Sequence, residues 1–301
     1  MKQLTQSAYA RAVEYIMQNA RPLEKARFMY HFAGGSMNAV LEALVEFQNT
    51  DGGFGDGLEP DIRLHNSSVI ATTIAFQHFR EFAVAGDHPV VVNACRYLVD
   101  TYDNEHHNWP IVPPNVSDAP HAPWWTFKGD MPPINPRAEI AGYLLDYPDN
   151  FPEALGHEVV DIVVKHLLAH PDTMEMHDLQ CYLRLLKTPT LKPDAHTHIL
   201  SKLERIITNS VEHNPTRWQE YGLPPLGVAS RPDSPFAALF QDAIELNLDF
   251  IIDVQGSEGG WMPPWSWGED SSPAWERAKQ EWSGMITLNN LLTLRAFGRL
   301  G

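Results

Sequence analysis

The residues best suited to chemistry lie in a short acidic loop, where Asp56, Glu59 and Asp61 precede Arg63. Two carboxyl groups in different surroundings can divide the roles of general acid and general base, because their environments move their pKa values apart. Pro60 restricts the backbone between them and would help to fix their geometry. Asp56, Glu59 and Asp61 are therefore candidate catalytic residues, and Arg63 is a candidate substrate-binding residue. The alternative is a solvated turn in which a carboxylate pairs with Arg63 or caps the following helix.

A second candidate segment, 118–127, places His121 among prolines and two adjacent tryptophans, Trp124 and Trp125. Tryptophan faces suit the C–H faces of sugars, hydrocarbon chains or a cation, so both rings are candidate substrate contacts. His121 is a candidate catalytic proton shuttle, since its ordinary pKa lies near neutral pH. The alternative, in which the rings close one end of a helical barrel, is equally consistent with the sequence.

A third candidate segment, 261–270, contains Trp265 and Trp267 and ends in two acidic residues at 269–270. Glu281 follows shortly before the last apolar stretch and joins the two tryptophans as a candidate substrate contact. The favoured alternative for Glu281 is a residue at the C-terminal end of its helix, or an ion pair with Arg277 or Lys279.

No metal or cofactor site is expected. The 14 histidines are scattered, and their close pairs have no cysteine or acidic ligand at standard metal spacing. Cys181 has Asp178 and His177 nearby, but Leu179 stands where an Asp-x-Cys zinc pattern would place its carboxylate. We therefore interpret Cys181 as a buried helix residue. The sequence also contains no glycine-rich phosphate loop and no recognisable nucleophile–base motif.

A glycine-rich turn that occurs twice indicates how these segments are positioned. Residues 48–54 and 255–261 share the pattern Gln-x-x-x-Gly-Gly-aromatic, and each follows an apolar stretch with helical character. Looser echoes end at Trp109 and Trp218. Repetition of a helix-ending turn predicts an architecture built from repeated units. Each glutamine is expected to bind backbone groups at helix ends, and the glycine pair to supply a positive φ.

Helical periodicity dominates the chain, and no set of residues alternates as strands would. Some stretches are apolar nearly all round, which is typical of helices covered on every side, whereas others have a solvent face. The expected fold is all-α: an α/α toroid of about six helical hairpins in two concentric layers, forming a single domain over 1–301. The predicted helices are 4–19, 23–32, 36–48, 67–84, 88–102, 136–147, 152–170, 174–187, 194–213, 235–255, 272–282 and 284–298.

The second glycine turn, preceded by Phe250-Ile251, resembles the QW repeat of the terpenoid cyclase and protein prenyltransferase superfamily. The first copy departs from it, with Ala43 where an aromatic residue is expected. Residues 47–61 and 121–125 also resemble a group of bacterial proteins described only as prenyltransferase-like. The resemblance implies the toroid and an isoprenoid substrate. It does not extend to the superfamily's catalytic motifs, since the sequence has neither Asp-x-Asp-Asp nor Asp-Asp-x-x-Asp.

Composition narrows the range of partners. The formal net charge of −16 argues against nucleic acid or an anionic membrane, because both attract clustered lysine and arginine. Two cysteines do not predict a disulfide framework, and no apolar run reaches the roughly 20 residues that span a bilayer. We expect a cytoplasmic protein that acts on a small molecule; its oligomeric state does not follow from the sequence.

The leading hypothesis is an enzyme that performs carboxylate acid–base chemistry in a tryptophan-lined central cavity. Its substrate is a carbohydrate or polyol, as the residues favour, or an isoprenoid, as the resemblance implies. The alternative is a catalytically silent toroid that binds a small molecule or a protein partner.

Overall fold

The computed structural model describes residues 1–129, 131–220, 222–268 and 272–301. Within these ranges the regular secondary structure is helical, and the β-type pairings are isolated bridges rather than strands. The prediction of an all-α fold is confirmed.

The chain divides into two compact units. The middle unit is continuous and comprises 45–210, whereas the terminal unit joins 1–44 to 211–301. Each unit is described here by itself. The single toroid expected over 1–301 stays a prediction.

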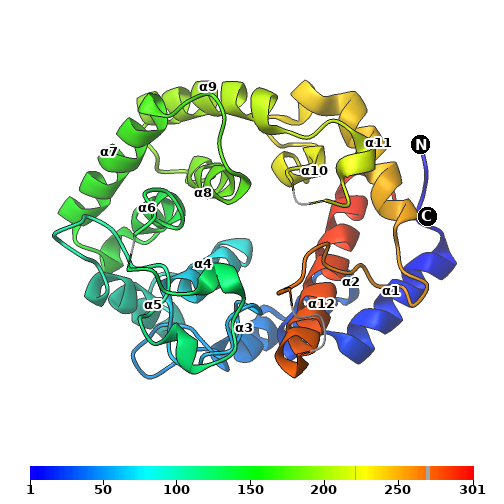
Figure 1. The fold of residues 1–301 in the computed structure, drawn as a ribbon, viewed down its shortest axis with the longest axis horizontal. Helices are drawn as coiled ribbons and strands as arrows, with labels where there is room; N and C mark the ends of the chain where they lie inside the picture. Colours follow the sequence, from blue (N-terminus) through cyan, green and yellow to red (C-terminus); the bar gives the residue numbers. More distant parts are fainter. Residues whose placement is uncertain (130, 221, 269–271) are drawn as a thin grey trace. The chain divides into compact units, whose positions relative to one another are not determined.

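The middle unit contains two layers of α-helices (Figure 1). Helices α4, α6 and α8 pack side by side in one layer, and α7 packs against α9 in the other. The bounds are α4 (Val69–Glu81), α5 (Pro89–Asp100), α6 (Arg137–Asp146), α7 (Glu153–Ala169), α8 (Met176–Leu186) and α9 (Pro193–Ser210), with the 3₁₀ turns Val116–Asp118, Pro123–Trp125 and Pro148–Asn150.

Helix α6 is the centre of this unit and is buried on every side over residues 137–144. It packs against α4, α7 and α8, which explains why its apolar residues form no single stripe. Its buried glutamate is paired: Glu139 lies 3.0 Å from a nitrogen of Arg184 and accepts a hydrogen bond from Tyr143 at 3.3 Å. Loss of either member of the Glu139–Arg184 pair would leave the other charge buried and uncompensated, which is destabilising.

The terminal unit is built from both ends of the chain. Helix α12 packs against α1 and α2, and residue 4 exchanges backbone hydrogen bonds with Arg299 (2.8 Å) and Gly301 (2.9 Å). The bounds are α1 (Gln6–Asn19), α2 (Pro22–Ala33), α3 (Met37–Val45, whose last residue begins the middle unit), α10 (Pro225–Val228), α11 (Gln241–Asp253) and α12 (Pro273–Ala296), with the 3₁₀ turns Pro215–Arg217 and Ala237–Phe240.

Most predicted helix ends lie within three residues of the observed ones, but two regions differ more. The expected helices 272–282 and 284–298 are one helix, α12, which continues through Gly284. A Cβ at Gly284 would lie 2.7 Å from the Cβ of Ala20, so this glycine allows a close approach of the backbone and does not end the helix. Helix α11 begins at Gln241 rather than near Pro235, because a 3₁₀ turn precedes it.

The two glycine-rich turns make the same contacts, as predicted. The Gln48 amide donates to the carbonyls of Gly52 and Val90, each at 2.9 Å. The Gln255 amide donates to Gly259 at 2.8 Å and to Ala8 at 3.0 Å. The first glycine of each pair has a positive φ, 92° at Gly52 and 95° at Gly259.

The helices beneath the turns repeat as well. An added Cβ would meet Asn93 and Tyr97 of α5 at the first glycine pair, and Arg11 and Tyr15 of α1 at the second. Gln48 binds the carbonyl of Val90 in α5, and Gln255 binds the carbonyl of Ala8 in α1. In both helices the residues that face the glycine pair lie three and seven positions after this carbonyl. The backbone N–H of the aromatic residue in each turn donates to a threonine hydroxyl at 3.0 Å: Phe54 to Thr72, and Trp261 to Thr287. One structural module therefore occurs once in each unit.

Three tryptophans bind backbone carbonyls of residues that lie 6, 10 or 11 positions before them in the sequence. The indole N–H groups of Trp109, Trp218 and Trp261 each donate to a backbone carbonyl at 2.7 Å, those of Leu98, Glu212 and Ile251. The looser echoes in the sequence thus share an indole–carbonyl bond with the clear second copy.

Candidate functional site

The acidic loop of the middle unit leaves the first glycine turn and is held at both ends by backbone hydrogen bonds. Gly55 N–H donates to Phe47 at 3.0 Å, and Ser68 N–H donates to Phe54 at 2.9 Å. Within the loop, Asp56 N–H donates to Leu64 at 3.0 Å. These bonds give the loop a defined conformation without a helix or strand.

Glu59 and Asp61 are buried, with exposed fractions of 6% and 3%. The Asp61 N–H donates to Oε1 of Glu59 at 3.3 Å, so the first carboxylate folds back over the turn that carries the second. The apolar neighbours Leu58 and Ile62 are also buried and anchor this turn. Their burial does not fit a solvated turn, while the pairing with Arg63 that the same alternative included stays open. Burial of carboxylates is costly and is common at functional sites.

Asp56 differs from the other two acids. It is only half-buried, and its carboxylate lies 2.7 Å from Nδ1 of the exposed His65. Its φ of 53° lies in the left-handed region, next to Gly57 at 79°. A Cβ at Gly57 would lie 2.7 Å from the guanidinium carbon of Arg63, so the glycine makes room for that side chain, which also donates to the carbonyl of Pro60 at 3.1 Å.

The second candidate segment lies against the first. Arg63 N–H donates to Pro120, and Ala122 N–H donates to Asp61, both at 2.9 Å, which pairs Ile62 with His121 in an antiparallel bridge. Residues opposite one another in such a bridge share a face, and their neighbours along the chain point to the other face. His121 is therefore on the side of Ile62, and Asp61 and Arg63 are on the opposite side.

Both ring nitrogens of His121 have partners within its own segment. Nδ1 lies 2.9 Å from the carbonyl oxygen of Ala119, and Nε2 lies 3.1 Å from the hydroxyl of Thr126. Since a carbonyl only accepts, Nδ1 donates to Ala119, whereas the Thr126 hydroxyl can either donate to Nε2 or accept from it. These contacts hold the 119–126 loop closed, and a proton shuttle to Asp61 would require the ring to turn.

The adjacent tryptophans have different surroundings. Trp124 is 46% exposed. Trp125 packs against a core cluster that includes Ile62 and Leu64, and its buried indole N–H has no acceptor among the described residues. Trp125 thus anchors the segment, while Trp124 presents its ring to solvent.

The third candidate segment belongs to the terminal unit and forms an aromatic cluster with α12. The rings of Trp265 and Trp282 meet edge to face at 5.2 Å, and those of Trp267 and Trp275 lie 5.9 Å apart. The buried indole N–H groups of Trp265 and Trp282 lack an acceptor among the described residues. Glu269 and Asp270, which end this segment, lie outside the described residues.

Glu281 is buried beside this cluster and pairs with Arg277 of its own helix at 3.0 Å. The ion pair expected for Glu281 is confirmed.

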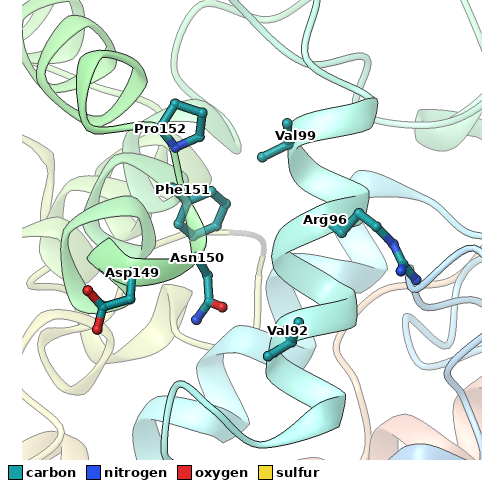
Figure 2. Close-up of a pocket in the computed structure, with 7 residues that line it drawn as sticks. All are labelled: Val92, Arg96, Val99, Asp149, Asn150, Phe151 and Pro152. Carbon is teal, nitrogen blue, oxygen red and sulfur yellow. The ribbon is translucent and has the colours of Figure 1, made fainter.

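A shallow pocket that the sequence did not indicate lies between α5 and the segment before α7. Its volume is about 410 Å³, and Val92, Val99 and Phe151 supply apolar walls. Figure 2 shows Val92 and Val99 facing the 149–152 segment, whereas the Arg96 guanidinium points away from it. The pocket therefore offers little polar chemistry.

The described residues contain no group of three or more histidine, cysteine or acidic side chains arranged to hold a metal ion. Cys181 is buried, and burial raises the pKa of its thiol well above the ordinary value, as in a structural cysteine. Its sulfur lies 3.7 Å from the side-chain oxygen of Asn135.

The structure brings Asp56, Glu59, Asp61, Arg63 and the 119–126 segment together within the middle unit. Trp265, Trp267 and Glu281 form a separate group within the terminal unit. A search with models of protein families finds no match to the sequence, and a search of curated proteins finds none either. Across the described ranges, every helix is too short or too polar to cross a membrane.

Proposed function

We propose that the chain is an α/α toroid related to the terpenoid cyclase and protein prenyltransferase superfamily. Two observations support this. The middle unit has two helical layers, and the module of glycine turn, threonine and outer helix occurs in both units with the same offsets. In the terminal unit, the outer helix of the module is α1, the first helix of the chain. A repeat whose last copy docks on the first helix is the arrangement that closes a ring.

The proposed activity is acid–base catalysis by Glu59 and Asp61. The observation that carries this is their burial on one tightly bonded turn, two residues apart. Removal of two carboxylates from water destabilises a fold, and a protein retains such groups where they act on a ligand or hold a network. Arg63 beside them would orient an oxygen-rich substrate.

A carbohydrate or polyol is the favoured substrate, and an isoprenoid is the second. The buried indole N–H of Trp125, in the segment bonded to the acidic loop, has no acceptor among the described residues, in contrast to the tryptophans of the repeat. A hydroxyl oxygen can accept this hydrogen bond, and hydrocarbon cannot. The protein would then act on a small molecule without a cofactor.

The test uses isosteric variants. Glu59→Gln and Asp61→Asn are compared with wild type on oligosaccharides, sugar alcohols and isoprenoid alcohols, with products identified by mass spectrometry. Asp161→Asn is the matched control, because Asp161 is an exposed residue of α7 in the same unit. Loss of turnover in the first two variants only, with unfolding temperatures within about 2 °C of wild type, is expected. Full turnover in both variants would refute the proposal.

A catalytically silent binding toroid is the second candidate. It is favoured by the contacts of His121, which hold its own loop, and by the packing of Trp125 in the core. In that case wild type would bind a ligand of the panel without converting it. Calorimetry on Glu59→Gln, showing binding without turnover in either protein, would favour this candidate.

A further inference from the structure

A buried guanidinium without a carboxylate lies at the start of α6. Arg137 is 7% exposed, and its hydrogen bonds go to two backbone carbonyls, Nη1 to His107 at 3.2 Å and Nη2 to Pro133 at 2.5 Å. Its Nε is buried and has no acceptor among the described residues. Carbonyl oxygens satisfy hydrogen bonds but do not neutralise a charge, so this cation is left uncompensated.

Two other buried arginines among the described residues are paired with acids. Arg21, equally buried at 7%, donates from Nε and Nη2 to the two carboxylate oxygens of Glu24, both at 2.8 Å. Arg299 binds Asp249 at 2.9 Å and also Glu245. Arg21 binds its carboxylate through the edge formed by Nε and Nη2. On the same edge of Arg137, the Nε has no acceptor among the described residues.

Other polar atoms near Arg137 are also unsatisfied. The hydroxyl of Tyr102 and Oδ1 of Asn108 are buried and have no partner among the described residues. Asn108 binds the carbonyl of Pro132 at 3.0 Å, next to the Pro133 carbonyl that Arg137 binds. Burial lowers the pKa of Arg137, and the neighbours that oppose this are the phenols of Tyr182 and Tyr102 rather than carboxylates.

The nearby acids are engaged elsewhere. Glu158 contacts His107, and Asp103 lies 3.1 Å from Nδ1 of His106. His166 also lies close to Arg137, and burial, aided by the charges of His170 and Arg137, lowers its pKa and favours the neutral ring. The guanidinium therefore faces phenols and a neutral imidazole.

We propose that Arg137 and Tyr102 form a binding site for a small carboxylate. The Nε–Nη2 edge would hold both oxygens of the ligand in the manner of Arg21 and Glu24, and the Tyr102 hydroxyl would donate a third hydrogen bond. A monoanion neutralises the single buried charge, whereas a phosphate dianion would leave a negative charge buried. The turn 104–107 is exposed and touches the guanidinium through the His107 carbonyl, so the ligand enters by displacing this turn.

The test is thermal unfolding of the full chain with acetate or propionate from 0 to 50 mM, at ionic strength held constant with chloride. Wild type should show a saturable rise in unfolding temperature of about 3 °C when acetate reaches ten times its dissociation constant. Arg137→Lys should lose the saturable rise, because an ammonium group lacks the planar edge. Tyr102→Phe should require several-fold more acetate, and it removes a hydroxyl that bonds nothing in the described structure.

The matched control is Arg21→Lys, which changes an arginine of equal burial that already has its carboxylate. It should retain the acetate response, whatever its own stability. Arg205→Lys, at an exposed ion pair with Asp172, is the control if the first variant fails to fold. The proposal is overturned if chloride or phosphate gives the same rise, if wild type shows none, or if Arg137→Lys responds as wild type does.

Discussion

Substitution of the two repeat glutamines by alanine tests whether the glycine turns are equivalent. Each amide donates two hydrogen bonds of 2.8–3.0 Å to backbone carbonyls, and each joins its own turn to a helix distant in sequence. A hydrogen bond contributes about 1 kcal/mol net to stability, so each substitution should cost about 2 kcal/mol. The two losses should be equal within about 0.5 kcal/mol, and they should add in the double variant because the sites share no partner.

The assay is urea unfolding followed by circular dichroism, with the free energy of unfolding extrapolated to water. Gln18→Ala is the control, because Gln18 is exposed and bonds only Glu14 of its own helix. Gln48→Glu should cost more than Gln48→Ala, since a carboxylate would face two carbonyl oxygens without a donor. Losses below about 0.5 kcal/mol for Gln48→Ala and Gln255→Ala, or a stable Gln48→Glu variant, would refute the reasoning.

Three further outcomes are expected. Glu139→Ala should lower the free energy of unfolding by about 3–5 kcal/mol in urea titrations, because it leaves the Arg184 charge without its buried partner. Burial lowers the pKa of His166 from the ordinary 6.5, so the stability that its neutral form contributes is present above about pH 6.5 and is lost as the pH falls. His166→Gln should therefore reduce the acid sensitivity of the free energy of unfolding, measured from about pH 7.5 to 5. Incubation with farnesyl or geranylgeranyl diphosphate and Mg²⁺ should release no more pyrophosphate than the doubly substituted Glu59→Gln, Asp61→Asn control, because ionisation of a diphosphate needs several positive charges around it and this chain has 22 basic against 38 acidic side chains.

The sequence predicts the helices and the glycine turns well because both depend on local chemistry. Gln48 and Gln255 each donate a hydrogen bond to a carbonyl four residues later, so the fixed spacing of glutamine and glycine in the sequence predicts this contact. The threonines that complete the module lie 18 residues after Phe54 but 26 after Trp261, so unequal loops hide their equivalence.

Side-chain surroundings in the candidate loops are less predictable. Glu59 and Asp61 differ from Asp56 in being buried. The bridge between Ile62 and His121 determines on which side of this pair of segments the imidazole lies. Both depend on contacts between segments about sixty residues apart. The sequence does not predict the Arg137 site. The site is distinguished by the folded structure, in which no described carboxylate lies beside the buried guanidinium.

The composition of the terminal unit has a consequence for biosynthesis. On the ribosome, residues 45–210 emerge as a continuous segment and can form their core before synthesis ends. Helices α1 and α2 emerge earlier but lack α12, against which both pack, until the last part of the chain is made. Their apolar faces therefore stay exposed during translation, which makes the nascent N-terminal helices the part of this protein most in need of a chaperone.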